Sequence, residues 1–225
     1  YKFLEGFLML LGTGYVVKGP IEIGPYFDAF SQNAVEGNRF SLGLQTSNDF
    51  SREVWLQSFL AYGTMDQRWK YGGSAEWIVR RSPRTEVFVE HTRDIDQLGM
   101  MSFFDQGNAL NSALQLNAQT RLSEVTRSEI SVLHEFGAGW GQALEFRHRT
   151  VAPRGEVQFV RESDPTGLSP LTTSELTIQT RYARNERFLS GAFERISLGS
   201  NWPILTATAT LGLPNILGSD CNYQR

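Results

Sequence analysis

The three histidines of this chain are the first candidates for metal binding or acid-base chemistry. His91, His134 and His148 stand alone in the sequence. No His-x-x-x-His, His-Glu-x-x-His or His-x-His spacing exists that would bring two imidazoles to one metal ion. His134 and His148 fall on the apolar faces of extended segments, where packing at an interface is the ordinary role of a histidine. We therefore predict no metal site built on histidine.

A pair of carboxylates is the second candidate. Asp94 and Asp96 flank Ile95 at the end of an extended segment, so both side chains could point the same way. Such a pair can bind Ca²⁺, which takes several oxygen ligands. An ion pair with Arg93 or the capping of a loop is the more ordinary role, and it is the one expected here.

No nucleophile or phosphate-binding loop is recognisable. The segment 72–76, Gly-Gly-Ser-Ala-Glu, lacks the last glycine of a Gly-x-Ser-x-Gly elbow, and Gly12-x-Gly14 does not extend into a dinucleotide fingerprint. Lys70 has no glycine-rich loop before it. Cys221 is the only cysteine, which excludes an internal disulfide and a Cys-x-x-Cys site. The sequence predicts a protein that is not an enzyme and needs no cofactor.

Charged residues recur instead on alternate positions of extended segments. The net charge of -3 gives no reason to expect a nucleic-acid partner. Arginines and glutamates share the polar faces of these segments, as expected of groups that must pair across an enclosed space. The predicted charge network comprises Arg39, Glu76, Arg80, Glu90, Glu145, Arg147, Glu175 and Arg181.

Two long strands, 54–64 and 70–81, form the centre of the expected fold, joined by a tight polar turn. In the second, Tyr71, Trp77 and Val79 share a face that alternates with a polar face, on which Ile78 is the only apolar residue. Each strand has about ten residues, twice the usual globular length and enough for a tilted strand to span a bilayer.

Similar segments follow one another along most of the chain. Strands are expected at 39–46, 85–94, 125–136, 140–151 and 171–184, and 188–198 and 203–213 are expected to form the last pair. Pro25 indicates an edge, a bulge or a strand start. About a dozen strands at regular spacing predict an all-β sandwich or barrel. We expect one domain over residues 1–225, with a short apolar or helical lead-in at 1–14 and barrel strands at 15–225.

Alternation alone does not separate a soluble β protein from a membrane barrel, because both have one apolar and one polar face. The strand lengths, the mixed charges on the polar faces and the aromatic residues near strand ends favour the membrane barrel.

Several short blocks carry a resemblance to a known family. The most specific are Asn33-Ala-Val-Glu-Gly-Asn-Arg39 and Leu60-Ala-Tyr-Gly-Thr-Met-Asp66, followed by Lys70-Tyr-Gly72 and by 93–99, Arg-Asp-Ile-Asp-Gln-Leu-Gly. Later segments at 188–193, 198–200, 203–205 and 217–223 follow in the same order. Together they resemble a Bacteroidota outer-membrane β-barrel family of unknown function, whose members carry a carboxypeptidase-regulatory-like domain before the barrel. The motif positions are Asn33, Glu36, Gly37, Arg39, Ala61, Tyr62, Gly63, Asp66, Lys70, Tyr71, Gly72, Asp94, Gln97 and Gly99.

The resemblance implies an antiparallel up-and-down transmembrane β-barrel in the bacterial outer membrane, here as a fragment without the regulatory-like domain and the C-terminal strands. Cys221 stands where the family has tyrosine. The family has no established catalytic residues. The expected function is a structural or envelope-biogenesis role in contact with the lipid bilayer and other outer-membrane proteins, with any small-molecule ligand unknown. A passive pore or transporter, a barrel enzyme and a soluble β-sandwich binding module remain alternatives.

Overall fold

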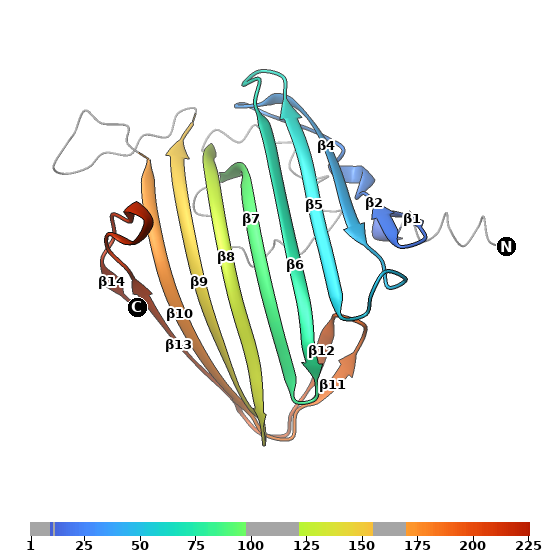
Figure 1. The fold of residues 1–225 in the computed structure, drawn as a ribbon, viewed down its shortest axis with the longest axis vertical. Coiled ribbons are helices and arrows are strands. Elements are labelled where there is room, and N and C mark those ends of the chain that lie inside the picture. Colours follow the sequence, from blue (N-terminus) through green and yellow to red (C-terminus); the bar gives the residue numbers. More distant parts are fainter. Residues whose placement is uncertain (1–9, 11, 98–121, 155–169) are drawn as a thin grey trace.

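The computed structural model describes residues 10, 12–97, 122–154 and 170–225. Within these ranges the chain is all-β, and twelve strands form one curved antiparallel sheet in up-and-down order (Figure 1). The sheet runs β1-β2-β4-β5-β6-β7-β8-β9-β10-β13-β14, with β3 pairing beside β2 on β4. Its strands are β1 Val16–Lys18, β2 Ile21–Ile23, β3 Phe30–Asn33, β4 Gly37–Thr46, β5 Val54–Gly63, β6 Trp69–Arg81, β7 Arg84–Gln97, β8 Leu122–Gly137, β9 Trp140–Pro153, β10 Leu171–Ala183, β13 Ile204–Gly212 and β14 Tyr223–Gln224.

The predicted central strands are confirmed, except that β5 ends one residue earlier than expected and β6 begins one residue earlier. Strands β4 to β10 have 10 to 16 residues, so the sheet is unusually tall. Partners in the ladder run from Val54 opposite Trp77 to Tyr62 opposite Trp69. Directly opposed residues lie on the same face of a sheet. In this register the apolar face predicted for one strand is therefore continuous with the apolar face predicted for the next, and the polar faces are continuous in the same way.

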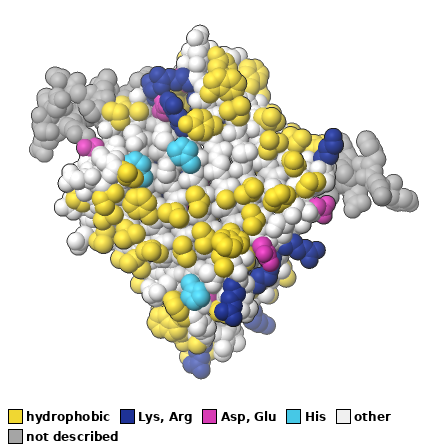
Figure 2. Space-filling model, viewed as in Figure 1, with side chains coloured by type: hydrophobic (Ala, Val, Ile, Leu, Met, Phe, Trp, Pro, Cys, Tyr) yellow, Lys and Arg dark blue, Asp and Glu magenta, His cyan; other side chains and the backbone are white. Residues whose placement is uncertain are grey.

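The sheet has an apolar outer face and a polar inner face. We call outer the face on which Leu42, Leu60, Trp77, Val89 and Ile130 lie. All five are exposed. Figure 2 shows bands of hydrophobic side chains crossing the middle of the face drawn in Figure 1, with charged side chains towards its ends. This distribution is the reverse of that in a soluble protein, whose apolar face would be covered.

The edge strand that pairs with β4 is interrupted near Pro25, as predicted, and its two parts are β2 and β3. Residues 24–29, including the short 3₁₀ helix η1 (Tyr26–Asp28), separate the two segments that pair with β4. The Gly24 N–H still donates to the Gly43 carbonyl oxygen at 3.0 Å. A Cβ at Gly43 would lie 2.1 Å from the Gly24 oxygen, so the backbones approach this closely only because position 43 is glycine.

The predicted pairing of the last two strands is wrong. Residues 188–198 form a hairpin of their own, β11 (Arg187–Ser190) with β12 (Arg195–Gly199), and β13 pairs with β10 instead. The physical reason is a tight turn in which the Gly191 N–H donates to the Glu194 carbonyl oxygen at 2.9 Å. It folds the predicted long strand back on itself.

The two ends of the sheet are β1 and β14, which do not pair with each other in the described residues. Most of the predicted lead-in at 1–14 lies outside those residues, apart from a helical turn in which the Gly14 N–H donates to the Leu10 carbonyl oxygen. A second 3₁₀ helix, η3 (Ile216–Gly218), precedes β14 and packs on β10. In the parts of the chain that are described, no helix has the length and apolar character needed to cross a membrane.

Candidate functional site: an ionic cluster at one end of the sheet

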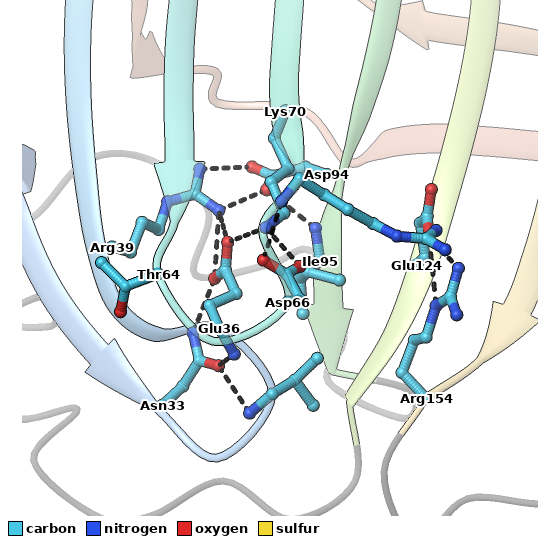
Figure 3. Close-up of polar contacts among 12 residues, drawn as sticks. Asn33, Glu36, Arg39, Thr64, Asp66, Lys70, Asp94, Ile95, Glu124 and Arg154 are labelled. Atoms are coloured by element: carbon cyan, nitrogen blue, oxygen red, sulfur yellow. Dashed lines mark hydrogen bonds and ion pairs between the residues drawn. The ribbon is translucent and has the colours of Figure 1, made fainter.

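Six polar side chains meet at one end of β3 to β7 (Figure 3). Two come from turns, because Glu36 precedes β4 and Asp66 lies between β5 and β6. The others lie on the strands that these turns connect. The ionic cluster comprises Asn33, Glu36, Arg39, Asp66, Lys70 and Asp94.

Glu36 is the centre of the cluster, with 1 % of its surface exposed. Its carboxylate accepts a hydrogen bond from Asn33 Nδ2 at 2.6 Å and forms ion pairs with Lys70 Nζ at 2.8 Å and Arg39 Nη1 at 3.2 Å. The backbone N–H groups of Val35 and Glu36 both donate to Asn33 Oδ1. This local turn fixes the position of the Glu36 carboxylate between the strands.

Two further carboxylates complete the cluster. Lys70 Nζ contacts Asp66 Oδ2 at 2.5 Å, and its side chain is 3 % exposed. Arg39 pairs with Asp94 through both terminal nitrogens, one at 2.9 Å, in the bidentate geometry favoured between guanidinium and carboxylate. Two cations and three carboxylates thus give a net charge of -1. Every charged group of the cluster has an oppositely charged partner, so the cluster joins β4, β6 and β7 and the turns between them through ion pairs.

Glycines leave the space that the cluster fills. A Cβ on Gly63 would lie 2.4 Å from Asp66 Oδ1 and 2.8 Å from Lys70 Nζ. Gly37 has a φ of +68°, a backbone conformation that side chains rarely adopt. A Cβ on Gly72 would lie 2.4 Å from a ring carbon of Phe59. Packing therefore explains Gly63 and Gly72, and the backbone conformation explains Gly37.

The motif positions taken from the resemblance converge in space. All six members of the cluster belong to them, although they span residues 33 to 94. Ala61 is buried, Tyr62 packs on Trp69 with ring centroids 5.0 Å apart, and Tyr71 is exposed on the outer face. Gln97 ends β7, and Gly99 lies outside the described residues. The contacts within the ionic cluster were not predicted from the sequence. The signal that could have indicated them is the register of the 54–81 hairpin, which sets Ala61 opposite Lys70.

The predicted ion pair of Asp94 with Arg93 is wrong. Asp94 pairs with Arg39, whereas the neighbouring Arg93 pairs with Glu124. Adjacent residues of a strand point to opposite faces, so the side chains of Arg93 and Asp94 point away from each other. Within the described ranges no group of three or more His, Cys, Asp or Glu side chains could hold a metal ion.

The predicted charge network resolves into local ion pairs. Glu90 pairs with Arg127 at 2.6 Å, Arg147 with Glu129 at 2.8 Å, and Glu76 with Arg84 at 3.7 Å. Arg127, Glu129 and Arg84 are the partners that sequence reasoning missed, because each stands on the adjacent strand.

The remaining members of the predicted network have separate surroundings. Arg147 also contacts Glu145 at 2.7 Å on its own strand, and the buried Glu175 accepts a hydrogen bond from the hydroxyl of Tyr223. Arg80 is exposed, next to a register shift in the pairing of β6 with β7. The structure thus does not bring the eight predicted residues together.

Arg181 forms a bidentate pair with Glu186, which lies just outside the sheet, at 2.6 and 2.7 Å. The Arg181 guanidinium, through these hydrogen bonds, lowers the pKa of Glu186 below its usual value. The hydroxyl of Ser197 on β12 also donates to this carboxylate. The pair therefore ties the sheet to the β11–β12 hairpin.

The β11–β12 hairpin lies against the inner face at the other end of the sheet. The ring of Phe193 stacks on Trp55 of β5 with centroids 5.9 Å apart, and its carbonyl oxygen accepts a hydrogen bond from Arg84 Nη2 at 2.8 Å. Arg195 pairs with Glu135 on β8. Figure 1 shows the hairpin behind the lower ends of the central strands. It therefore crosses the inner face from β8 to β5.

The three histidines lie on the outer face, each opposite a hydroxyl group. His91 contacts Ser128 at 2.8 Å, His134 contacts Thr85 at 2.9 Å and His148 contacts Ser174 at 3.0 Å. The predicted position of His134 and His148 on apolar faces is confirmed. The Nδ1 atom of each ring takes part in a cross-strand hydrogen bond, an ordinary sheet contact.

The class defined by fold and site is thus an up-and-down antiparallel sheet with an apolar outer face and ion-paired polar groups on its inner face. Comparison with protein-family models, with curated proteins and with solved structures finds no match to this chain.

Proposed function

We propose that this chain is a non-enzymatic β-barrel protein of the bacterial outer membrane, of the Bacteroidota type that its motifs resemble. In this proposal it serves as a structural or envelope-biogenesis component beside other outer-membrane proteins. Lipid covers the outer face, and the inner face is filled by the protein's own side chains.

The inverted polarity of the sheet is the observation that carries the proposal. Leu42 is 56 % exposed, Leu60 48 %, Trp77 50 % and Ile130 46 %, on strands that lie side by side. Soluble monomers rarely expose a contiguous apolar patch of more than a few hundred Å². In a bilayer the middle of this face lies in hydrocarbon, while the ionic cluster and the other ion pairs of the inner face stay on the side away from lipid.

Aromatic pairs at both ends of the outer face support the same conclusion. Tyr62 and Trp69 pack together at one end, and Trp140 and Tyr182 pack together at the other with centroids 4.8 Å apart. Tryptophan and tyrosine gather where a membrane protein meets the headgroups, because their rings are amphipathic. The two pairs fit two such belts.

The proposal requires that the sheet edges be paired in the membrane, since lipid does not tolerate unpaired backbone groups. The edges β1 and β14 must then pair with each other or with further strands. A soluble β-sandwich would need two packed sheets, whereas the described strands form one sheet and one two-stranded hairpin.

A passive pore is the second candidate, favoured by the Arg and Glu side chains of the inner face. The β11–β12 hairpin and the mutual pairing of those charges argue for a blocked interior. Conductance of the full-length protein in a planar bilayer separates the two candidates. Silent bilayers support the structural role, and discrete channels support the pore.

The experiment that tests the proposal is fractionation of cells that make the full-length protein, with gel mobility before and after boiling. We expect recovery in the outer membrane and a mobility shift on boiling, as for a closed barrel, with partner chains retained in detergent. Recovery in the soluble fraction with no shift overturns the membrane assignment. Recovery as a lone, freely diffusing barrel overturns the partner role alone.

A further inference from the structure

A second charged group lies at the same end of the sheet as the ionic cluster, but on the other face. The carboxylate of Glu124 on β8 is contacted by three guanidinium groups. Arg93 approaches at 2.6 Å, Arg68 at 2.9 Å, and Arg154 through its Nε at 3.1 Å. Figure 3 shows Glu124 and Arg154 apart from the ionic cluster, beyond Asp94 and Ile95. We call Arg68, Arg93 and Arg154, together with the Glu124 that they contact, the arginine triad.

The register of the sheet places the triad on the outer face. Glu124 is opposite Ile95, and two residues along each strand Thr126 is opposite Arg93. The same alternation leads to Ile130 opposite Val89, both exposed on the apolar outer face. Since residues two apart share a face, Glu124 and Arg93 point outward as well.

The triad carries an excess of positive charge that the ionic cluster does not. Three guanidinium groups and one carboxylate give a net charge of +2, whereas the ionic cluster has -1. Each guanidinium has five N–H groups, and the bonds to Glu124 occupy at most two of them. The Glu124 side chain is 10 % exposed, but those of Arg68, Arg93 and Arg154 are 45, 39 and 34 % exposed. The carboxylate thus orients three cations that still face outward.

Aromatic side chains lie beside the triad on the outer face. Arg93 is directly opposite Tyr71, and the Tyr62–Trp69 pair lies at the same end of the same face. Aromatic rings of this kind mark the level of lipid headgroups in a membrane protein. Apolar outer-face residues continue from there towards the middle of the strands, where acyl chains would lie.

We propose that the arginine triad binds the phosphate group of a membrane lipid. A guanidinium group matches phosphate because its planar fork donates two parallel hydrogen bonds. The Glu124 carboxylate already holds the three guanidinium groups of the triad close together. The lipid's acyl chains then cover the apolar side chains next to the triad. This inference rests on the proposed membrane location and adds a ligand class to it.

The test uses the full-length protein in nanodiscs of phosphatidylcholine that contain a small fraction of phosphatidic acid. The protein is released gently from the nanodiscs, and the lipids that stay bound to it are counted by native mass spectrometry. We expect the wild-type protein to retain phosphatidic acid in preference to phosphatidylcholine. Arg93→Gln and Arg154→Gln should each lower that retention about tenfold, because each removes a charge-assisted contact to phosphate. Arg80→Gln, an exposed arginine at the opposite end of the sheet, is the matched control and should change nothing.

Glu124→Gln separates lipid binding from a structural role. It removes the carboxylate but raises the net charge of the triad to +3, so retention of phosphatidic acid should equal or exceed that of the wild type. A loss equal to that of the arginine variants overturns the proposal, since it would mean that only the ion pairs matter.

Two further outcomes would overturn the inference while leaving the membrane proposal intact. One is insertion into the nanodisc with no preference for phosphatidic acid. The other is displacement of the lipid by inorganic phosphate, which would assign the triad to free phosphate. Failure of the protein to insert at all overturns both proposals together.

Discussion

The buried charge of the ionic cluster predicts an unequal response to two substitutions that remove opposite charges. Lys70→Met leaves three carboxylates with Arg39 alone and takes the cluster from -1 to -2. Glu36→Gln keeps the shape of the side chain, leaves Lys70 with Asp66 at 2.5 Å, and takes the net charge to zero. The lysine variant should therefore be the more damaging.

The magnitudes follow from burial. Lys70 and Glu36 have side chains exposed by only 3 % and 1 %, so water does not replace a lost partner. Removing one member of a buried pair costs about 3–5 kcal/mol, which we expect for Lys70→Met. Loss of a charge-assisted hydrogen bond alone costs about 1.5–3 kcal/mol, which we expect for Glu36→Gln. The double variant should cost less than the sum, by about 0.5–3 kcal/mol.

The assay is urea unfolding of the full-length protein in detergent, followed by tryptophan fluorescence and by gel mobility without boiling. Glu194→Gln is the control, because Glu194 is exposed and its loss should change the free energy of unfolding by less than about 0.5 kcal/mol. If Glu36→Gln destabilises the protein as much as Lys70→Met, or the two losses simply add, the charge-balance argument is refuted.

Three further results are expected. Gly63→Ala should cost about 1–3 kcal/mol in urea unfolding, because its Cβ meets Asp66, whereas Gly73→Ala, whose Cβ meets its nearest atom at 3.5 Å, should cost less; equal costs would contradict the packing role of Gly63. Ile130→Arg on the outer face should lower bilayer stability by about 2–4 kcal/mol if that position is near the midplane, measured by refolding into liposomes, and no loss would argue against lipid contact. The pKa of Glu186 is lower in the folded protein than in the unfolded chain. Its pair with Arg181 therefore stabilises the hairpin fully at pH values above the pKa of the unfolded chain, and this stabilisation is lost as the pH falls through the pKa of the folded protein. The protection factors of residues 187–199 against hydrogen exchange, which correct for the intrinsic pH dependence of the exchange rate, should therefore fall in acid in the wild type and show no such fall in Glu186→Gln.

Local patterns predicted much of the fold. The period-two alternation of 54–63 and 70–81 gave both strands, and Ile78, predicted as the only apolar residue on a polar face, is 2 % exposed. The pairing of 188–198 failed because Ser190 and Gly191 are weak signals of a turn, and only contacts with β5, β7 and β8 make that hairpin favourable.

The candidate site was predictable as a set of residue types but not as a contact map. Asn33, Glu36, Asp66 and Lys70 stood out as parts of motifs, yet nothing local says that the carboxylate of residue 36 meets the amine of residue 70. Likewise Arg80 and Arg147 have the same side chain on similar strands. One is exposed beside a register shift, and the other lies between two glutamates.

The sequence by itself determined that this protein is built of long antiparallel strands with one apolar and one polar face, because alternation is a property of neighbouring residues. Only the tertiary structure decided which face turns outward, which charges pair and where the last hairpin lies. The physical reason is that strand register and sheet curvature bring together residues distant in the chain. Burial and ion pairing then depend on those neighbours and not on the residue's own type.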